Sequence, residues 1–351
     1  MFFSNFTILD WSTAFLSKDN GIPANVRIGN CLITRNKELL SKSDAVVVEV
    51  RSIAHLKDMP QHREPWQRWI YLNTESPFYF TTLDYVNNYK TKINGNYKMN
   101  DFKGKLAFNW TMTHRGDSDV PLIQGFPVEK TPQERSDTII ALLNRKKKLV
   151  AGEVNNCIYV TNGRSKYMAE LKKHLELDIY GKCGTLQCAG HYSAKHGGCQ
   201  KVKEYKFFLA FENSNCRDYI SEKIWVQAFD NEAVPVVMGG NREDYVKLVP
   251  PGSFIHTDDF ESPRELAAYL KRLDKNEAAY MKYHEWRATY KTKYEVKFLG
   301  TYVWERMCIE LNKRYRERPQ WHKIITDFEN AEKDCYLNKW VSKVCNGTIC
   351  Q

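Results

Sequence analysis

The sequence predicts an α/β protein built around parallel β-sheets. Apolar runs rich in β-branched residues, such as DAVVVEV at 44–50, are typical of buried strands. These runs alternate along the chain with helix-like segments, as in a parallel sheet covered by helices. The chain has 351 residues and a hydrophobic content of 42%, which is enough for two domains that each bury a core. We therefore expect two successive α/β domains.

The first half of the chain predicts two strands and a helix. The run at 44–50 is one strand, and RWIYLNTE at 68–75 reads as a strand that ends in a loop. DTIIALLNRKKK at 137–148 predicts a helix whose basic end matches the negative pole of its dipole. Because a basic run meets LVAGEV near 145–155, we place the boundary there and expect domains 1–150 and 151–351.

The second half predicts a longer alternation of strands and helices. An amphipathic helix is expected at 164–177, because Tyr167, Leu171 and Leu175 recur on one face. SPRELAAYLKRLD at 262–274 predicts a helix that opens with a serine cap. The expected strands are 156–162, 177–184, 205–211 and 233–240.

Residues 205–240 read as strand, turn, helix and strand, which together make a βαβ unit. Asp218 is expected to cap the helix. The residues of its buried stripe are Ile220, Ile224 and Ala228. Lys223 would then lie near the helix start, where the dipole disfavours a cation. That position raises the question of which anion the lysine serves.

The turn ENSN before this helix lies at the carboxyl end of a parallel strand, where open α/β sheets bind ligands. Free amide groups at a helix start bind phosphate, so we interpret Lys223 as a phosphate ligand and Glu222 as an acceptor for ligand hydroxyls. The alternative is that Lys223 extends to solvent while Glu222 complements the dipole. No GxGxxG or GxxxxGK[ST] motif accompanies the turn, which disfavours a dehydrogenase or P-loop protein.

The chain is basic, with 52 Lys and Arg against 42 Asp and Glu and a net charge of +10. Such an excess favours anionic partners in general. The densest runs, NRKKK at 144–148 and NKRYRERPQWHK at 312–323, lack the glycine and aromatic pattern of an RNA-binding sheet. We interpret both runs as solvated helix faces and expect no nucleic-acid partner.

Ten cysteines and three N-x-S/T sequons, at Asn5, Asn109 and Asn346, predict a secretory lumen, N-glycosylation and disulfides. The opening MFFSNFTILDW is too short and too polar for a signal peptide or a membrane span. Two alternatives stay open, either a cytosolic chain or one whose N-terminal anchor has been removed or lost.

The cysteines gather in two clusters. CGTLQCAGHYSAKHGGC at 183–199 lacks the CxxC pair of a zinc site, so we expect disulfides and no metal. Cys216 completes an even set of four with the cysteines of that stretch. A second cluster at the tail contains Cys308, Cys335, Cys345 and Cys350. Pairing within the clusters does not follow from sequence.

The long stretch YKFFLAFENSNCRDYISEKIWVQAFDNEAVPVVMGG at 205–240 resembles the signature of the α1,3-fucosyltransferase family. Further resemblance lies in RWIYLNTESP at 68–77, VTNGRSKYMAELKKH at 160–174 and PPGSFIHTDDFESPRELAAYLKRLDKN at 250–276. The resemblance implies a GT-B-type glycosyltransferase fold, in which two Rossmann-like domains face a cleft. It makes 1–150 the acceptor-side domain and 151–351 the domain that binds GDP-fucose and carries a cysteine-rich tail.

The resemblance also implies an activity. Such an enzyme moves L-fucose from GDP-β-L-fucose to the 3-hydroxyl of N-acetylglucosamine in glycoprotein glycans, with inversion of the anomeric centre. Inversion in one displacement needs a base on the face opposite the leaving group. The matching carboxylate is Glu75 in LNTESP, which without the resemblance would read as a loop acid on the surface.

The family pattern places the donor on Asn213, Tyr219, Glu222 and Lys223, and this chain has the matching residue at each position. Arg164 follows a predicted strand and can grip phosphate bidentately. Arg115 in THRGDSD is a further candidate near the substrates. No cofactor is expected, although manganese is a candidate stimulator, and catalysis should survive chelation.

The acceptor stays open between core and antennary N-acetylglucosamine. Glu49 and Val50 stand where Lewis-type relatives carry histidines, whereas YGKCGTLQC is similar to invertebrate and plant members. The resemblance further implies a Golgi lumen location with a type II membrane anchor that this chain does not show. It also pairs Cys31 with Cys157 across the two domains.

Two competing hypotheses remain. One is a catalytically silent relative that binds a glycan or a sugar nucleotide, which measurement of turnover would separate from an enzyme. The other is a basic nucleic-acid-binding protein, which predicts an affinity that falls steeply with salt. The ten cysteines and the sequons argue against the latter.

Overall fold

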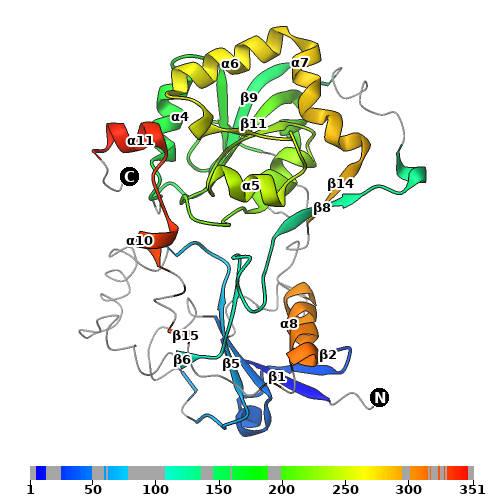
Figure 1. The fold of residues 1–351 in the computed structure, drawn as a ribbon. Coiled ribbons are helices and arrows are strands. Elements are labelled where there is room, and N and C mark those ends of the chain that lie inside the picture. The colour runs from blue at the N-terminus through cyan, green and yellow to red at the C-terminus, as the bar shows by residue number, and fades with distance from the viewer. Residues whose placement is uncertain are drawn as a thin grey trace. The chain divides into compact units, whose positions relative to one another are not determined.

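The computed structural model of the chain describes residues 5–12, 25–49, 59–60, 62–77, 107–135, 145–158, 160–188, 199–294, 301–314, 317, 323–324, 328 and 330–346. The chain forms two compact units, each built on its own sheet (Figure 1). The N-terminal unit combines Met1–Ile123 with Phe298–Asp334, and the C-terminal unit combines Gln124–Lys297 with Cys335–Gln351.

This division corrects the boundary expected at residue 150. Strand β8 (Gly125–Glu129) pairs antiparallel with β14 (Tyr290–Tyr294), which places it in the C-terminal unit. Helix α8 (Thr301–Arg314) instead belongs to the N-terminal unit, so a segment from the last sixth of the chain completes that unit. No local feature of the sequence marks the placement of β8 or of α8, because both placements depend on contacts between segments far apart along the chain.

The N-terminal unit contains a six-stranded sheet in the order β2-β3-β1-β4-β5-β7. Strand β2 runs antiparallel to β3, and the other neighbours are parallel. The strands are β1 (Phe6–Asp10), β2 (Asn25–Ile28), β3 (Cys31–Thr34), β4 (Ala45–Glu49), β5 (Arg68–Asn73) and β7 (Trp110–Thr113). The strands expected at 44–50 and 68–75 are therefore confirmed as β4 and β5.

Successive side chains of β4 point to opposite faces of this sheet, and both faces are buried. Ala45 and Val47 lie in a cluster with Trp304 and Leu311 of α8, whereas Val46 lies in a second cluster on the other face. A strand buried on both faces reads as a continuous apolar run. The short elements of this unit are η2 (Lys37–Lys42), β6 (Ala107–Phe108), β15 (Lys323–Ile324) and α10 (Ala331–Asp334).

The C-terminal unit contains a five-stranded, wholly parallel sheet in the order β10-β9-β11-β12-β13. The strands are β9 (Lys148–Glu153), β10 (Leu177–Tyr180), β11 (Tyr205–Phe211), β12 (Val234–Met238) and β13 (Ile255–His256). Three of them confirm the strands expected at 177–184, 205–211 and 233–240. The predicted βαβ unit is also confirmed, because β11 and β12 are adjacent and parallel.

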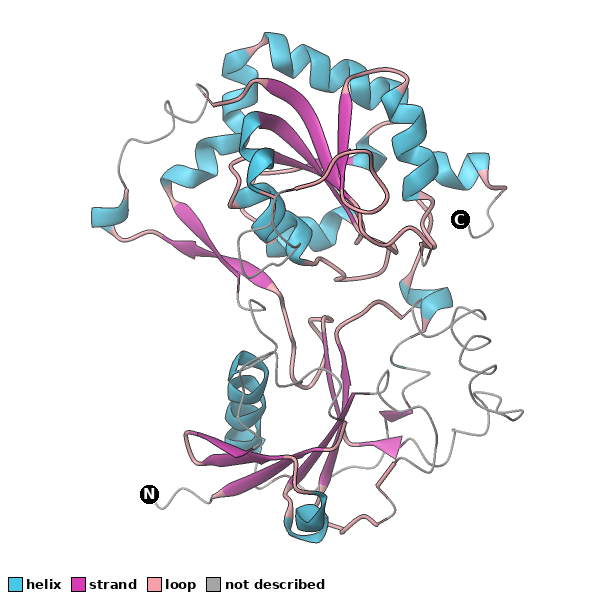
Figure 2. Cartoon of the chain, turned by 180° about the vertical axis from the view of Figure 1, so that it is seen from behind, coloured by secondary structure: helices cyan, strands magenta, loops and turns pink. Residues whose placement is uncertain are grey.

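Helices cover both faces of this sheet (Figure 2). Helices α4 and α6 pack with the cluster on one face, and η9 and α5 pack on the other. The bounds are α4 (Arg164–Lys172), η9 (Lys223–Phe229), α5 (Arg242–Leu248), α6 (Pro263–Lys275), α7 (Glu277–Met281) and α11 (Lys339–Val344). The short helices are η6 (Pro132–Glu134), η8 (Gln200–Glu204), η10 (Thr257–Asp259) and η11 (Lys282–Ala288). Ser262 accepts a hydrogen bond from the Glu265 amide, which confirms the predicted cap of α6.

Two expected elements differ from the structure. The described residues of the expected strand 156–162, which are 156–158 and 160–162, form a loop instead, because the apolar run at 148–153 supplies β9 and Ile158 is 75% exposed. Most of the helix expected at 137–148 falls on 136–144, outside the described residues. Its last residue, Lys148, begins β9 instead of ending a helix.

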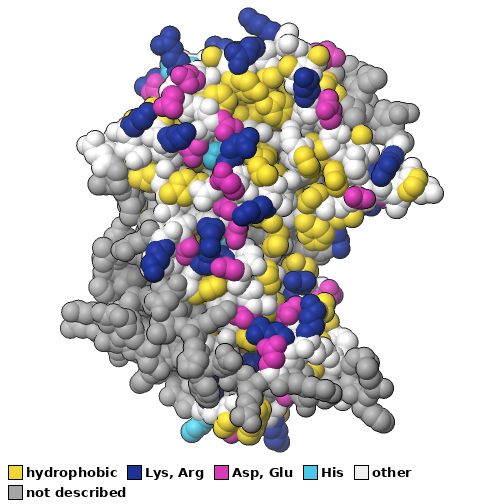
Figure 3. All heavy atoms as spheres, in the orientation of Figure 1, with side chains coloured by type: hydrophobic (Ala, Val, Ile, Leu, Met, Phe, Trp, Pro, Cys, Tyr) yellow, Lys and Arg dark blue, Asp and Glu magenta, His cyan; other side chains and the backbone are white. Residues whose placement is uncertain are grey.

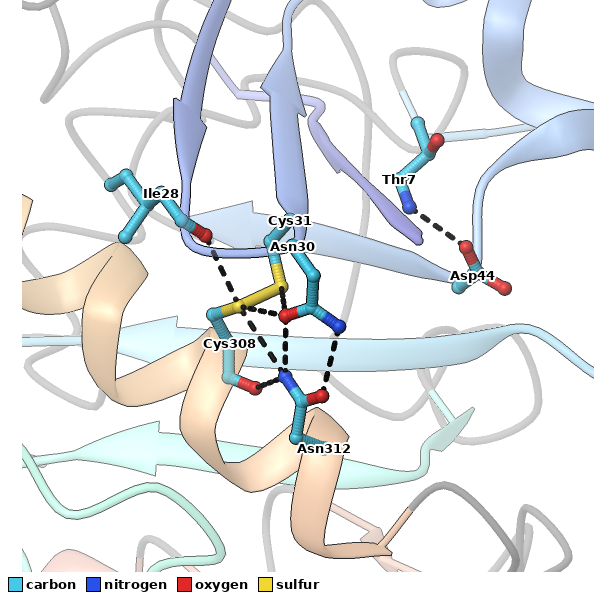
Figure 4. The surroundings of a disulfide bond; sticks show 7 residues. All are labelled: Thr7, Ile28, Asn30, Cys31, Asp44, Cys308 and Asn312. Atoms are coloured by element: carbon cyan, nitrogen blue, oxygen red, sulfur yellow. Dashed lines mark hydrogen bonds between the residues drawn. A yellow bond between two sulfur atoms is a disulfide. The ribbon is translucent and has the colours of Figure 1, made fainter. Parts of the chain in front are cut away.

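The disulfides correct the expected pairing of Cys31 with Cys157. Cys31, at the start of β3, bonds Cys308 of α8, and Asn30 and Asn312 hydrogen-bond reciprocally beside it at 2.9 Å (Figure 4). The other disulfides are Cys157–Cys183, Cys188–Cys199 and Cys216–Cys335, and Cys345 is also disulfide-bonded. Each of the four pairs lies within one unit, because the pairing follows local packing rather than joining the two units.

Candidate functional site

The carboxyl edge of the C-terminal sheet gathers buried polar side chains. Strand β11 ends at Phe211 and is followed by Glu212 to Asn215, all but one of which are buried. Helix α4 begins nearby at Arg164, preceded by Asn162, whose amide donates to the Glu212 carbonyl at 2.9 Å. Ligands of parallel α/β sheets bind at this edge. The structure therefore brings two of the predicted segments, 160–164 and 212–223, together.

Lys223 is the first residue of η9, and its nearest anion belongs to the chain itself. The ammonium lies 2.8 Å from Glu212 Oε2, 2.8 Å from Ser221 Oγ and 3.4 Å from Glu222 Oε1. The side chain of Glu212 is 2% exposed and that of Lys223 is 17% exposed. Burial lowers the pKa of Lys223, but the charges of Glu212 and Glu222 outweigh it and leave the pKa above its ordinary value. The ammonium is therefore charged and fixed in position.

Arg164 is almost fully buried and is held by the backbone of two neighbouring loops. Nη1 donates to the Phe211 carbonyl at 2.9 Å and Nη2 donates to the Asn156 carbonyl at 2.8 Å. Its Nε has no hydrogen-bond partner among the described residues. Gly163, with φ of 66°, supplies the left-handed turn that starts α4. The guanidinium is thus oriented before any ligand arrives.

The other predicted donor residues lie on the segment between β11 and η9. Asn213 is half-buried, and its carbonyl accepts from the Thr161 amide at 3.0 Å. Tyr219 is buried and Glu222 is partly exposed. Burial lowers the pKa of Arg164, whereas nearby Glu212, Tyr219 and Glu222 raise it, which shows that these groups share one electrostatic environment.

The expected cap at Asp218 is wrong. Asp218 adopts a left-handed φ of 59°, and its amide donates to Asp244 Oδ2 at 3.0 Å. The helix η9 begins at Lys223, with Glu222 in the capping position. Because buried Asp244 draws the Asp218 backbone into a turn, the helix starts later than the sequence suggested. The stripe of Ile220, Ile224 and Ala228 is buried as predicted.

Sequence reasoning missed two acids at this edge. One is Glu212, which also accepts from the Ser221 amide at 2.8 Å. The other is Glu153, the last residue of β9, which is 8% exposed and whose Oε2 has no hydrogen-bond partner among the described residues. Burial chiefly raises the pKa of Glu153, Glu222 raises it further, and Lys223 lowers it. The available signal was an acid directly at the end of each apolar strand run.

The C-terminal tail stabilises the loop that carries these groups. Cys335 is bonded to Cys216, and the Tyr336 amide donates to the Asn215 carbonyl at 2.8 Å. The Tyr336 hydroxyl donates to the Gly239 carbonyl at 3.0 Å, beyond the end of β12. Gly239 is required there, because a Cβ would lie 2.5 Å from the Tyr245 hydroxyl and 2.7 Å from Glu212 Cγ.

Glu75 follows the end of β5 at the carboxyl edge of the N-terminal sheet. It is half-buried, and its amide donates to Asn73 Oδ1 at 2.9 Å. The flanking Asn73 and Ser76 are fully buried. Buried neighbours on both sides hold the backbone of Glu75, so this acid is not a free surface loop residue. Glu75 and the Lys223 group belong to different units.

Two further acids end strands at the same edge of the N-terminal sheet. Asp10 ends β1 and Glu49 ends β4, and both are buried. Burial raises the pKa of Asp10 to about 7, Arg35 opposes this at 3.2 Å, and the charge of Glu49 adds to it. This edge therefore holds three acids at strand ends, whereas the corresponding edge of the other sheet combines the acids Glu153 and Glu212 with the cations Lys223 and Arg164.

Arg115 is buried at the end of β7 and its charge is matched inside the unit. Its guanidinium lies 2.7 Å from Asp117 and 2.9 Å from Asp334, and it stacks at 4.1 Å over the Phe328 ring. These contacts fix the segment that contains Asp334 against β7. The guanidinium is thus oriented by protein groups.

The three sequons have different surroundings. Asn5 and Asn346 are exposed. Asn109 is 5% exposed, and its Oδ1 accepts from the Trp69 amide at 2.7 Å and from Arg63. Because a glycan needs the Asn side chain at the surface, this burial argues against glycosylation at Asn109.

Neither a metal cluster nor a membrane span is found in the part of the chain that the structure describes. No group of three or more His, Cys, Asp or Glu side chains lies within reach of one ion there. Within the same residues, every helix is too short or too polar to cross a bilayer.

Two family models match the chain and together span most of it. The one described as "Glycosyltransferase family 10 (fucosyltransferase) C-term" matches residues 143–331. The one described as "Fucosyltransferase, N-terminal" matches residues 4–125.

Relatives with curated names are similar over most of the chain. "Glycoprotein 3-alpha-L-fucosyltransferase A" of Drosophila melanogaster is 34% identical over 92% of this chain, which spans 59% of the fly protein. "3-galactosyl-N-acetylglucosaminide 4-alpha-L-fucosyltransferase FUT3" of Bos taurus is 34% identical over 84% of the chain and 72% of its own length. "4-galactosyl-N-acetylglucosaminide 3-alpha-L-fucosyltransferase 9" of Mus musculus is 35% identical over 82% of the chain and 72% of its own length.

A solved structure shares the fold. The crystal structure titled "alpha1,3-Fucosyltransferase with GDP-fucose" aligns with a TM-score of 0.51 and 15% sequence identity. The alignment covers 91% of this chain and 92% of that one. The α/β fold with parallel sheets predicted from the sequence is therefore confirmed.

Proposed function

The chain belongs to glycosyltransferase family 10, the fucosyltransferase family, and from this premise we propose that it transfers L-fucose from GDP-fucose to a glycan. The acceptor atom is the 3-hydroxyl of an N-acetylglucosamine residue in a glycoprotein glycan. The observation that carries the proposal is the buried ion pair of Lys223 with Glu212 at the carboxyl end of β11, beside the oriented guanidinium of Arg164. Fixed cations at this edge suit a sugar nucleotide.

Lys223 and Arg164 stabilise the departing GDP. As the sugar bond breaks, negative charge develops on the β-phosphate, and preorganised cations lower the energy of that state most when they need no rearrangement. Of the three partners of the Lys223 ammonium, Glu222 is the most distant, at 3.4 Å. We expect a phosphate oxygen to take that position, while Glu222 turns to a hydroxyl of the donor. Asn213 and Tyr219 complete the donor contacts.

Glu75 acts as the base for a single displacement. Its carboxylate takes the proton of the acceptor hydroxyl while the hydroxyl oxygen forms a bond to the anomeric carbon. The bond from that carbon to the β-phosphate oxygen breaks, and GDP leaves with the electron pair. Attack opposite the leaving group inverts the anomeric centre. The rigid backbone around Glu75 supports this assignment.

The name of the fly relative, a glycoprotein 3-alpha-L-fucosyltransferase, supports a glycoprotein glycan as the acceptor. The cattle and mouse relatives are named as galactosyl-N-acetylglucosaminide fucosyltransferases. Their names support an antennary N-acetylglucosamine as the second candidate acceptor. The disulfides support an oxidising lumen, such as that of the Golgi.

The test is a transfer reaction with the purified chain, GDP-fucose and a mixed panel of N-glycans and lactosamine oligosaccharides, read by mass spectrometry. Fucose on the innermost N-acetylglucosamine identifies a core enzyme, and fucose on an antenna identifies a lactosamine enzyme. Activity is expected to persist in a chelator, because side-chain cations carry the leaving charge, and manganese should at most stimulate it.

The same reaction separates an enzyme from a silent relative. Binding of GDP-fucose without any product on any acceptor would overturn the transferase proposal and leave a binding protein. Absence of both binding and product would also contradict the donor site.

A further inference from the structure

The basic run that ends at Lys148 does not lie on a helix face. Lys146 and Lys147 lead directly into β9, which begins at Lys148. This places the run at the amino edge of the C-terminal sheet, since β9 runs from Lys148 to Glu153. The solvated helix expected from the sequence therefore does not explain these lysines.

A hollow of about 740 Å³ lies at this edge and collects lysines from four elements. Eight lysines and only two acids line it. Besides the run at 146–148, the lysines come from the end of α4, the start of β11 and the end of α6. Figure 3 shows Lys and Arg side chains along the top of the view, over α6. Segments far apart in sequence thus build one concave, basic surface.

Half of these lysines have a partner inside the protein. Lys148 pairs with Asp178 at 2.9 Å, Lys206 with Asp274 at 2.7 Å and Lys173 with Glu170 at 2.7 Å. Lys146 donates to two backbone carbonyls, those of Lys203 at 3.0 Å and Asn231 at 3.2 Å. Three of these charges are neutralised by carboxylates, and burial lowers the pKa of Lys146 to about 7.

The other four lysines of the lining have no acidic partner within the described residues. Lys147, Lys172, Lys271 and Lys275 are exposed, and their side-chain ammonium groups make no hydrogen bond or ion pair with any described residue. Lys172 and Lys275 lie in the last turns of their helices, where a cation complements the dipole. That reasoning does not apply to Lys147, which precedes a strand. Of the two acids in the lining, Asp274 already pairs with Lys206, so only Glu176 offsets these four lysines, and the excess of like charge around the concavity favours a bound anion.

The hollow is separate from the candidate donor site. Helix α4 begins at Arg164, at the carboxyl edge of the sheet, and ends at Lys172, which lines the hollow. The two basic regions therefore lie at opposite ends of the same helix and of the same parallel strands.

We propose that this hollow binds a small polyanion that carries two or more phosphate or sulfate groups. Its volume lies in the range of small-molecule sites. Lysine ammonium groups are mobile point charges that suit clustered tetrahedral oxyanions. A ligand with one charge would neutralise one lysine only, whereas a polyanion bridges the unmatched lysines of α4, α6 and the segment before β9. The proposal is independent of the transferase activity.

Calorimetric titration tests it with two probes, sodium tripolyphosphate and a fully sulfated heparin disaccharide. Saturable binding with one site per chain is expected for at least one of them, and the affinity should fall as NaCl is raised. Binding of tripolyphosphate alone identifies a phosphate ligand, binding of the disaccharide alone identifies a sulfated one, and binding of both supports the shared chemistry. Binding of neither overturns the proposal.

Matched variants locate the binding. The double variant Lys172→Gln, Lys271→Gln should weaken it by roughly tenfold or more, because it removes two of the unmatched charges. The control Lys247→Gln, Lys282→Gln removes the same charge from two exposed lysines outside the hollow and should leave the affinity within about twofold. Equal weakening in both double variants, or loss of binding when excess GDP is added, would contradict a site at this hollow.

Discussion

The carboxyl edges of the two sheets are both formed by parallel strands, but they differ in the balance of charge that they hold. In the N-terminal sheet, Asp10 and Glu49 end their strands and Glu75 follows a third. In the C-terminal sheet, the corresponding edge holds two oriented cations, Lys223 and Arg164. Topology places the polar groups at this edge in both units, because it is there that the buried strands end. The residue types that follow each strand then decide whether the edge attracts a proton or a phosphate.

The two edges also differ in how their charges are compensated. Lys223 has a carboxylate at 2.8 Å and remains charged, whereas Asp10 has a guanidinium at 3.2 Å and still has its pKa raised to about 7 by burial. The C-terminal edge thus stabilises the positive charge of Lys223, whereas burial at the N-terminal edge disfavours the negative charge of Asp10. This contrast can be broken by four substitutions, two at each edge.

Glu75→Gln should have the largest effect. An amide of the same shape cannot accept the acceptor proton, so kcat is expected to fall by on the order of 10²–10⁴ while GDP-fucose binding changes little. Single-turnover transfer with a glycan acceptor measures the rate, and calorimetry measures the binding. If the variant matched the parent rate, Glu75 would not be the base.

Lys223→Met should lower kcat/KM by on the order of 10²–10³, because one preorganised charge at the leaving phosphate is lost. The matched control is Lys282→Met, an exposed lysine at the start of η11. The control is expected to retain parental activity and donor affinity. Equal losses in the two variants would indicate a general effect of charge rather than a role at the donor phosphate.

Glu212→Gln should weaken the C-terminal edge through Lys223. The substitution removes the nearest counter-charge of the ammonium and leaves only Glu222, at 3.4 Å. The loss of unfolding free energy should therefore lie at or below about 3–5 kcal/mol, which is the cost of breaking an isolated buried pair. Urea unfolding measures the loss, and the Michaelis constant for GDP-fucose should rise because the ammonium is no longer held. Lys343 and Glu261 form an exposed pair at 2.8 Å, and Glu261→Gln should leave the urea midpoint nearly unchanged, because solvent screens such a pair.

Asp10→Asn should have the smallest effect on the transfer reaction, and its effect on stability should depend on pH. Asp10 has a pKa of about 7 when folded and an ordinary value of 3.8, so the unfolded chain releases this proton first as pH rises. The contribution of Asp10 to folding stability is therefore complete below about pH 4 and declines until about pH 7. Each unit of pKa difference corresponds to about 1.4 kcal/mol, and the decline ends at the folded pKa.

Urea unfolding of the parent and of Asp10→Asn at pH 4.5, 6 and 7.5 checks this expectation. The variant should lose the decline between the first and last pH, because its amide does not ionise. Parallel pH profiles for the two proteins would show that Asp10 is not the titrating group.

The parts of the fold that were predicted correctly have local causes. Strand β11 matches the predicted range 205–211, because a strand buried on both faces is a continuous apolar run between polar turns. Helix α6 was found from its serine cap and the apolar period behind it. The segments that carry Glu75, Arg164 and Lys223 were found through resemblance of whole motifs rather than through the chemistry of each residue.

The parts that were missed depend on contacts between distant segments. The partner of Lys223 is Glu212, eleven positions away along the chain, and the sequence pointed to an external anion instead. The helix start moved from Asp218 to Lys223 because Asp244 holds the Asp218 amide. The disulfide of Cys31 closes on Cys308 across a sequence separation of 277 residues.

The sequence by itself determined the fold class, the buried strands and the family, because apolar runs, caps and long motifs act within a few residues of one another. Only the tertiary structure decided which charges are paired, where the two units divide and which cysteines meet. It also brought together lysines of four elements into one hollow. The physical reason is that the energies of charge pairing, packing and repulsion decrease as the groups move apart in space. The distance between two groups in space bears little relation to their separation along the chain.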